Sequence, residues 1–143
     1  MLTPTIVVID NDPLDYAMVT KLLINEGYHV ADNATSARLA IDSTHPVPAL
    51  LILDLHAAYP ASGWEILTRI RRRSATRTLP VILLTTDARF GQQYRTHIQA
   101  MGAIVLEKPL LVEDLLDAVA WAVGRRQPVV TQSRIYRGRA AGY

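Results

Sequence analysis

The 143-residue chain contains no cysteine, so disulfide bonds and thiolate metal sites are excluded. It has no apolar run near the ~20 residues that a membrane-spanning helix needs. Its first residues, MLTPTIVVID, lack the basic segment of a signal peptide. Half of the residues are hydrophobic, which is enough to build the core of one folded domain. We therefore expect a cytoplasmic globular protein with no membrane partner.

Acidic residues are absent from the C-terminal segment 125–143, which contains five arginines. Subtracting these arginines leaves 10 basic and 13 acidic residues in 1–124, a net charge of −3, although the whole chain carries +2. Helical periodicity also stops at residue 124. We expect a folded domain over 1–124 and a basic, solvated tail over 125–143. No DNA-reading element accompanies the arginines, so we expect no nucleic-acid partner.

Continuous apolar runs alternate with segments of helical periodicity along the first 124 residues. The predicted strands are 5–9, 28–32, 49–53, 80–85 and 103–107, and the predicted helices are 12–27, 35–43, 62–73, 88–102 and 112–124. This alternation predicts a doubly wound α/β fold of the (βα)5 type, with a five-stranded parallel sheet between helices. Binding sites of such sheets lie outside the carboxyl ends of the strands.

The spacing of apolar residues predicts which helix faces are buried. The residues expected in the core are Leu14, Ala17, Met18 and Leu22 in the first helix, Trp64, Leu67 and Ile70 in the third, Phe90, Tyr94 and Ile98 in the fourth, and Val112, Leu115, Leu116, Val119 and Val123 in the last. The arginine-rich run RIRRR at 69–73 is interpreted as the solvated face of its helix. His29, His45 and His97 show no spacing typical of a metal site.

Polar residues follow the apolar runs at the points where the predicted strands end. Asp10 and Asn11 follow the first strand, Asp54 the third and Lys108 the fifth, and Thr85 closes the fourth. If the strand order is 2-1-3-4-5, these four strands are neighbours and their polar ends converge. A carboxylate such as Asp54 is costly to place at the end of a buried strand unless it has partners there.

The motifs VVIDNDP, LLILDL with the later GWEIL, PVILLTT and EKPL together resemble the receiver domain of two-component response regulators. The resemblance covers residues 5 to about 124 and implies the strand order 2-1-3-4-5. It implies that Asp54 accepts a phosphoryl group from a histidine kinase or a histidine phosphotransfer protein. It also implies that Thr85 is the phosphate-sensing hydroxyl and that Lys108 pairs with the phosphate. Such a domain is not an enzyme; it signals by binding a downstream partner.

The resemblance further implies a Mg²⁺ site formed by Asp10, Asn11, Asp54 and the backbone carbonyl of His56. The chemistry agrees, because Mg²⁺ prefers hard oxygen ligands and an aspartate can attack phosphorus to give an acyl phosphate. Phosphoryl transfer depends mostly on positioning and charge stabilisation, which a lysine ammonium supplies. The family also has a cis peptide at the position of Lys108-Pro109.

Four positions depart from the family pattern. Asn11 replaces the second acid of the metal-binding pair, which removes one negative charge. The loop after Asp54 is one residue longer than usual, which puts the carbonyl of His56 in doubt as a ligand. Thr86 stands in place of a small alanine. Val105 stands where the family has an aromatic switch residue, so we expect any response to travel another way, such as through the loop 86–91.

These departures support a second hypothesis, a pseudo-receiver that binds partners regardless of phosphate. A phosphatase of the haloacid dehalogenase type is a third, but its motif needs an acid two residues after the nucleophile, and that residue is His56. The family also uses its fourth helix, fifth strand and fifth helix as a partner surface. By resemblance, a homodimer would form through helix 88–102, strand 103–107 and helix 112–124.

Overall fold

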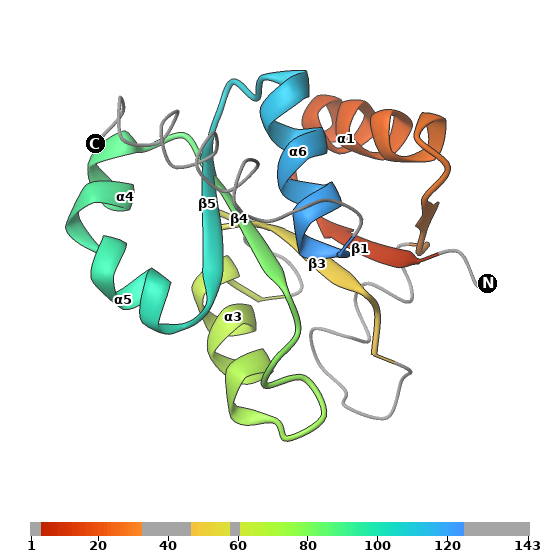
Figure 1. The fold of residues 1–143 in the computed structure, drawn as a ribbon. Helices are drawn as coiled ribbons and strands as arrows, with labels where there is room; N and C mark the ends of the chain where they lie inside the picture. The colour runs from red at the N-terminus through yellow and green to blue at the C-terminus, as the bar shows by residue number, and fades with distance from the viewer. Residues whose placement is uncertain (1–3, 33–46, 58–60, 125–143) are drawn as a thin grey trace.

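The computed structural model describes residues 4–32, 47–57 and 61–124, which form a parallel sheet with helices on both faces (Figure 1). The strands are β1 (Thr5–Ile9), β2 (His29–Val30), β3 (Leu50–Asp54), β4 (Val81–Thr85) and β5 (Ala103–Glu107). The helices are α1 (Pro13–Asn25), α3 (Gly63–Arg72), α4 (Ala88–Gln93), α5 (Arg95–Ala100) and α6 (Val112–Ala122). The predicted helix 35–43 and tail 125–143 lie outside the described residues.

The sheet has five strands in the order β2-β1-β3-β4-β5, and every neighbouring pair is parallel. Both the fold class and the predicted strand order are therefore confirmed. β2 is shorter than predicted, because only two of its residues pair with β1. Within the described residues, no helix combines the length and apolar character needed to cross a lipid bilayer.

Alternate residues of the buried strands point to opposite faces of the sheet and build two hydrophobic cores. One core contains α1 and α6 residues such as Leu23 and Leu115 against Ile52 and Leu84 of the sheet. The other contains α3 and α5 residues such as Ile66 and Ile98 against the opposite side of the strands. Because β3 and β4 are buried on both faces, their sequences are continuous apolar runs that end abruptly at polar residues.

The buried face of α1 differs from the predicted one. Val19 and Leu23 enter the core, whereas Leu14 is 82% exposed and Met18 is also exposed. Apolar residues occur on more than one face of this helix, so spacing alone did not identify the packed side. Packing against the sheet selected the stripe that contains Val19.

Two short helices replace the single helix predicted over 88–102. The break falls at Tyr94, whose φ and ψ of −106° and 12° are not helical. The first of the two segments contains Gly91, and a glycine inside a helix costs about 1 kcal/mol relative to alanine. Across the break, the Tyr94 and His97 rings pack on Trp64, with centroid distances of 6.2 and 5.4 Å. Tyr94 stays partly exposed while Ile98 is buried, so only part of the predicted apolar face is core.

The last helix follows the prediction more closely. α6 buries Leu115 and Val119 as expected, but Val112 in its first turn is 49% exposed. Ala118 and Ala120 are buried although the apolar stripe did not include them. Val112 lies on the same stripe as the buried Leu115 and Val119, but at the first position of the helix, next to the exposed Leu111.

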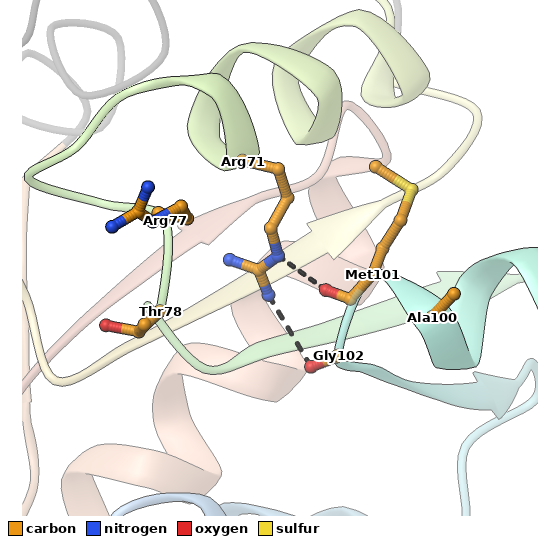
Figure 2. A pocket seen from close by; sticks show the side chains of 6 residues that line it. All are labelled: Arg71, Arg77, Thr78, Ala100, Met101 and Gly102. Carbon is orange, nitrogen blue, oxygen red and sulfur yellow. Dashed lines mark hydrogen bonds between the residues drawn. The ribbon is translucent and has the colours of Figure 1, made fainter.

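Arg71 departs from the prediction of a fully solvated arginine run. Its guanidinium donates hydrogen bonds to the carbonyl oxygens of Met101 and Gly102 (Figure 2). It also donates to the carbonyl oxygen of Thr76. Partial burial lowers the pKa of Arg71 below its usual value. The side chain thereby ties the end of α3 to the turn before β5. A pocket of about 480 Å³ beside it is lined by Arg71, Arg77, Thr78, Ala100, Met101 and Gly102.

Candidate functional site

The polar side chains that were predicted to converge lie at the carboxyl edge of the sheet. β3 ends on Asp54 and β4 on Thr85, and these residues pair in register with Leu84 and Glu107. Asp10 follows β1 directly, and Lys108 follows β5. Since the strands are parallel, their carboxyl ends bring these groups to one rim.

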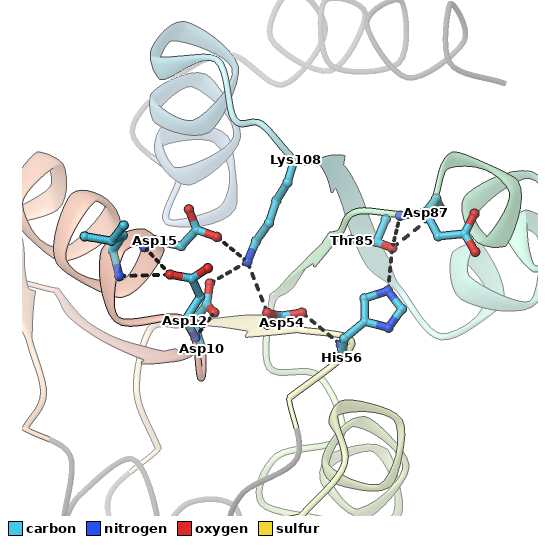
Figure 3. Close-up of polar contacts among 9 residues, drawn as sticks. Asp10, Asp12, Asp15, Asp54, His56, Thr85, Asp87 and Lys108 are labelled. Carbon is cyan, nitrogen blue, oxygen red and sulfur yellow. Dashed lines mark hydrogen bonds and ion pairs between the residues drawn. The ribbon is translucent and has the colours of Figure 1, made fainter.

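Lys108 is the centre of this rim (Figure 3). Its Nζ atom lies 2.9 Å from Oδ2 of Asp10, 2.9 Å from Oδ2 of Asp15 and 3.1 Å from Oδ2 of Asp54. The side chains of Asp10 and Lys108 are 0% and 8% exposed, and that of Asp54 is 11% exposed. Three carboxylates from β1, α1 and β3 therefore share one ammonium group in a largely dehydrated setting, where charge-assisted hydrogen bonds are strong.

The protonation states follow from burial and from these bonds. Burial raises the pKa of the Asp54 carboxyl, but the hydrogen bonds from the His56 backbone N–H and from Lys108, together with its coupling to Asp10, outweigh it, so the pKa lies below the usual value. Burial and the neighbouring Asp54 raise the pKa of Asp10. Burial lowers the pKa of Lys108, but its bonds to the carboxylates raise it above normal overall. Asp54 is thus ionised at neutral pH and can act as a nucleophile.

The Asp12 side chain caps α1 instead of contacting Lys108. Oδ1 of Asp12 accepts hydrogen bonds from the N–H groups of Leu14 and Asp15, at 2.9 and 3.2 Å, and so caps the N-terminus of α1. The Asn11 side chain lies in the exposed loop before this cap. The structure therefore brings Asp10, Asp54 and Lys108 together.

Thr85 is fully buried and contacts His56 rather than Asp54. Nε2 of the His56 ring lies 3.1 Å from the Thr85 hydroxyl, and that hydroxyl accepts a hydrogen bond of 3.0 Å from the Asp87 N–H. The backbone N–H of His56 donates to Oδ1 of Asp54 at 2.8 Å. His56 therefore bridges the carboxylate at the end of β3 and the hydroxyl at the end of β4 (Figure 3).

The loop after Asp54 is closed by backbone contacts. The Asp54 carbonyl accepts from the Ala57 N–H, and the Ala57 carbonyl accepts from the Gly63 N–H, both at 3.0 Å. A Cβ atom on Gly63 would lie 2.4 Å from the Asp54 carbonyl oxygen and 2.6 Å from that of Leu55. Only glycine permits this close approach. Residues 58–60, where the extra loop residue was inferred, lie outside the described residues.

Two contributions to the site were not anticipated from the sequence. The sequence analysis predicts Asp15 only as part of the first helix, and it predicts a role only for the backbone carbonyl of His56. The sequence did contain a signal for Asp15, because it stands three residues after the helix cap Asp12 and therefore lies in the first turn of the helix. The first turn of α1 follows shortly after Asp10, which comes directly after β1. The His56 side chain gave no such signal, since its contact with Thr85 depends on the path of the loop. Lys108-Pro109 is cis, as the resemblance implied.

The donor set fits Mg²⁺. Carboxylate oxygens of Asp10 and Asp54 both contact Nζ of Lys108, so they lie close to each other. Mg²⁺ is commonly held by one or two carboxylates, with waters completing its coordination shell. In the parts of the chain that the structure describes, no three His, Cys, Asp or Glu side chains form a ready metal cage. A site of this kind suits a hydrated hard cation and does not suit zinc.

Comparison with known proteins agrees with this geometry. Residues 6–120 match the response regulator receiver domain family. The chain belongs to this family. This family is the receiver domain of response regulators in two-component signal transduction, and the chain has its fold. A comparison with curated proteins finds no match.

Solved receiver structures share this fold. The receiver domain of a sensor histidine kinase from Pseudomonas aeruginosa, which holds a magnesium ion in its active-site cleft, is 21% identical, with a TM-score of 0.68 over 86% of this chain and 99% of that one. A chemotaxis response regulator of Vibrio cholerae is 23% identical, with a TM-score of 0.68 over 85% and 99%. A putative response regulator from Chloroflexus aurantiacus is 26% identical, with a TM-score of 0.69 over 87% and 100%.

Proposed function

We propose that this receiver domain accepts a phosphoryl group on Asp54 from a histidine kinase or a histidine phosphotransfer protein, with Mg²⁺ bound. The observation that carries the proposal is the contact of 3.1 Å between Oδ2 of Asp54 and Nζ of Lys108 at the carboxyl edge of the sheet. It gives an ionised carboxylate at the rim with a cation beside the position that an incoming phosphoryl group would take.

The transfer is a displacement at phosphorus. An oxygen of the Asp54 carboxylate attacks, the bond between phosphorus and the donor histidine nitrogen breaks, and that nitrogen leaves with the electron pair. The product is an acyl phosphate on Asp54. Lys108 then pairs with a phosphoryl oxygen, because its flexible stem lets the ammonium leave one carboxylate for another anion. The Asp54 backbone, held by Ala57, keeps the nucleophile at the rim.

The residues that would hold Mg²⁺ are Asp10 and Asp54, with the Asn11 amide oxygen and the His56 backbone carbonyl as uncharged donors. When bound, Mg²⁺ neutralises charge on the phosphoryl oxygens as the transfer proceeds. Asp10 is well placed for this set, since its side chain is buried and its Oδ1 atom already accepts the Asp12 N–H at 3.0 Å. That bond fixes the orientation of the carboxylate.

Phosphorylation would be read out through Thr85. A phosphoryl group adds roughly −1.5 to −2 charges and three strong acceptor oxygens. If the Thr85 hydroxyl donates to Nε2 of His56, it must exchange that bond for one to a phosphoryl oxygen, whereas the bond that it accepts from the Asp87 N–H uses a lone pair and can remain. Since Val105 has no ring to turn inward, the loop 86–91 is the segment that would move. A downstream protein would bind the altered surface. A homodimer formed through α4, α5, β5 and α6 would use the same surface.

The test is the intact mass of the protein after incubation with acetyl phosphate and Mg²⁺. We expect the gain of one phosphoryl group, which is lost in Asp54→Asn and in the presence of EDTA. Asp32→Asn, an exposed acid beyond β2, is the matched control and should still gain the group. A labelled Asp54→Asn variant, or a wild-type protein that is folded and unlabelled, would rule the proposal out.

The second candidate is a pseudo-receiver that binds partners regardless of phosphate. Two observations favour it: Asn11 lacks the charge of the second acid, and Val105 is 7% exposed in the core, where it cannot act as an aromatic switch. The mass experiment separates the two candidates. A folded protein that gains no phosphoryl group and shows no Mg²⁺ binding is the result that a pseudo-receiver would give.

A further inference from the structure

Asp15 is a carboxylate of the site that lies on a helix rather than on a strand end. It stands in the first turn of α1, and its Oδ2 atom lies 2.9 Å from Nζ of Lys108. The side chain is 33% exposed, whereas that of Asp10 is fully buried. Asp15 thus closes the solvent side of the group of carboxylates around Lys108 (Figure 3).

Its position is fixed by the start of the helix. The Asp12 side chain accepts the Asp15 N–H at 3.2 Å, which sets the first turn. A carboxylate in the first turn of a helix is also favoured by the positive end of the helix dipole. Because Asp12 is committed to capping, it cannot replace the acid that Asn11 lacks, and Asp15 is the nearby acid that reaches Lys108.

The charges in the site favour a specific role. A receiver site with two adjacent acids and a phosphoacceptor opposes three carboxylates to one lysine. Here Asn11 removes one of the three, and Asp15 restores the number from one helical turn away. We propose that Asp15 supplies the charge that Asn11 lacks, holding Lys108 in place and setting the affinity of the site for a divalent cation.

In this role Asp15 acts through its charge and through Lys108, not as a ligand of the cation. It is a positioning residue for Lys108. The inference rests on the proposed function for its purpose, since the cation would serve the transfer to Asp54, but the binding of Mg²⁺ is measured separately from that transfer. It also explains how a receiver that carries Asn11 can keep the charge its site needs.

The experiment is a Mg²⁺ titration by calorimetry on four proteins: wild type, Asp15→Asn, Asn11→Asp with Asp15→Asn, and Glu26→Gln. Asparagine keeps an oxygen for Lys108 and removes only the charge. We expect Asp15→Asn to weaken Mg²⁺ binding by about fivefold or more, as the loss of one unit charge a few ångströms away implies. Adding Asn11→Asp should restore affinity to within about twofold, because the same charge returns at another position.

Glu26→Gln is the control for net charge, because it removes one negative charge at the far end of the same helix, where the residue is exposed. It should leave Mg²⁺ affinity at the wild-type value. An unchanged affinity in Asp15→Asn, a failure of Asn11→Asp to restore it, or a wild-type protein that binds no Mg²⁺ would each overturn the inference.

Acetyl phosphate labelling of the same samples separates this inference from the proposed function. If the wild type binds Mg²⁺ and Asp15→Asn weakens that binding, the inference about Asp15 stands even when no phosphoryl group is gained, and only the proposed function fails. If the wild type is labelled and Asp15→Asn binds Mg²⁺ as tightly as wild type does, only the inference fails.

Discussion

Nε2 of His56 lies 3.1 Å from the hydroxyl oxygen of Thr85, and the backbone N–H of the same histidine donates to Asp54 (Figure 3). One residue therefore connects the proposed phosphoacceptor to the proposed sensing hydroxyl. With Nε2 of His56 as the acceptor, the Thr85 hydroxyl donates to the imidazole, so turning toward a phosphoryl oxygen exchanges one hydrogen bond for another. The His56–Thr85 contact therefore stabilises the unphosphorylated arrangement relative to the phosphorylated one.

His56→Ala should shift this balance toward the phosphorylated arrangement. Without the imidazole, the Thr85 hydroxyl loses no hydrogen bond to His56 when it turns toward a phosphoryl oxygen. A single hydrogen bond contributes about 0.5–1.5 kcal/mol net. We expect the apparent affinity for beryllofluoride with Mg²⁺, a mimic of an aspartyl phosphate, to rise by about two- to tenfold. His29→Ala, an exposed histidine on the short edge strand β2, is the control and should leave the affinity unchanged. Weaker binding in His56→Ala would show that the imidazole supports the bound state instead.

The fold was predictable because its signals are local and repeated. Continuous apolar runs identified the buried strands, and the polar residues that end them identified the rim. Faces of helices were less predictable. In α1 both the Leu14 and the Val19 stripes are apolar, and only packing on the sheet decides that Val19 is buried. The division at Tyr94 likewise depends on contacts with Trp64, far away in the sequence.

The site was predictable where its residues come from strand ends. Asp10, Asp54 and Lys108 meet because parallel strands share one edge, so sequence position implied their contact. Asp15 and the side chain of His56 could not be placed in this way. The contact of Asp15 with Lys108 depends on how α1 is oriented on the sheet, and that of His56 with Thr85 depends on the path of a loop. Both are set by tertiary packing.

Lys108→Met should destabilise the protein by about 2–4 kcal/mol near neutral pH, because it leaves buried carboxylates facing one another without a cation. The lowered folded-state pKa of Asp54 contributes stability above its unfolded value of 3.8, and that contribution is lost as the pH falls through the folded value. Lys108, whose pKa is raised in the fold, contributes at every pH below its unfolded value of 10.5. The difference between wild type and Lys108→Met should therefore be large at pH 7 and shrink below pH 3.8. Urea unfolding at several pH values measures it, and a difference independent of pH would contradict this account.

Arg71→Met should reduce the free energy of unfolding by about 1–2 kcal/mol, since three carbonyl groups lose a charged donor. The apolar stem is retained, so the change isolates the guanidinium. Arg72→Met, at the exposed neighbouring position, should change stability by no more than about 0.5 kcal/mol. Urea unfolding compares the two variants. Equal effects of the two substitutions would show that Arg71 contributes no more to stability than a solvated arginine does.

Gly63→Ala tests whether the start of α3 holds Asp54 in place. The added Cβ would lie 2.4 Å from the Asp54 carbonyl oxygen, and neither backbone can move without shifting the nucleophile or the helix. We expect a loss of about 3 kcal/mol in the free energy of unfolding, together with slower labelling by acetyl phosphate at a temperature where the variant is folded. Ser62→Ala is the control: it removes the cap that accepts the Glu65 N–H and should cost about 1 kcal/mol, with labelling unchanged. If Gly63→Ala lost stability and still reacted as fast as Ser62→Ala, the helix start would support the fold without positioning Asp54.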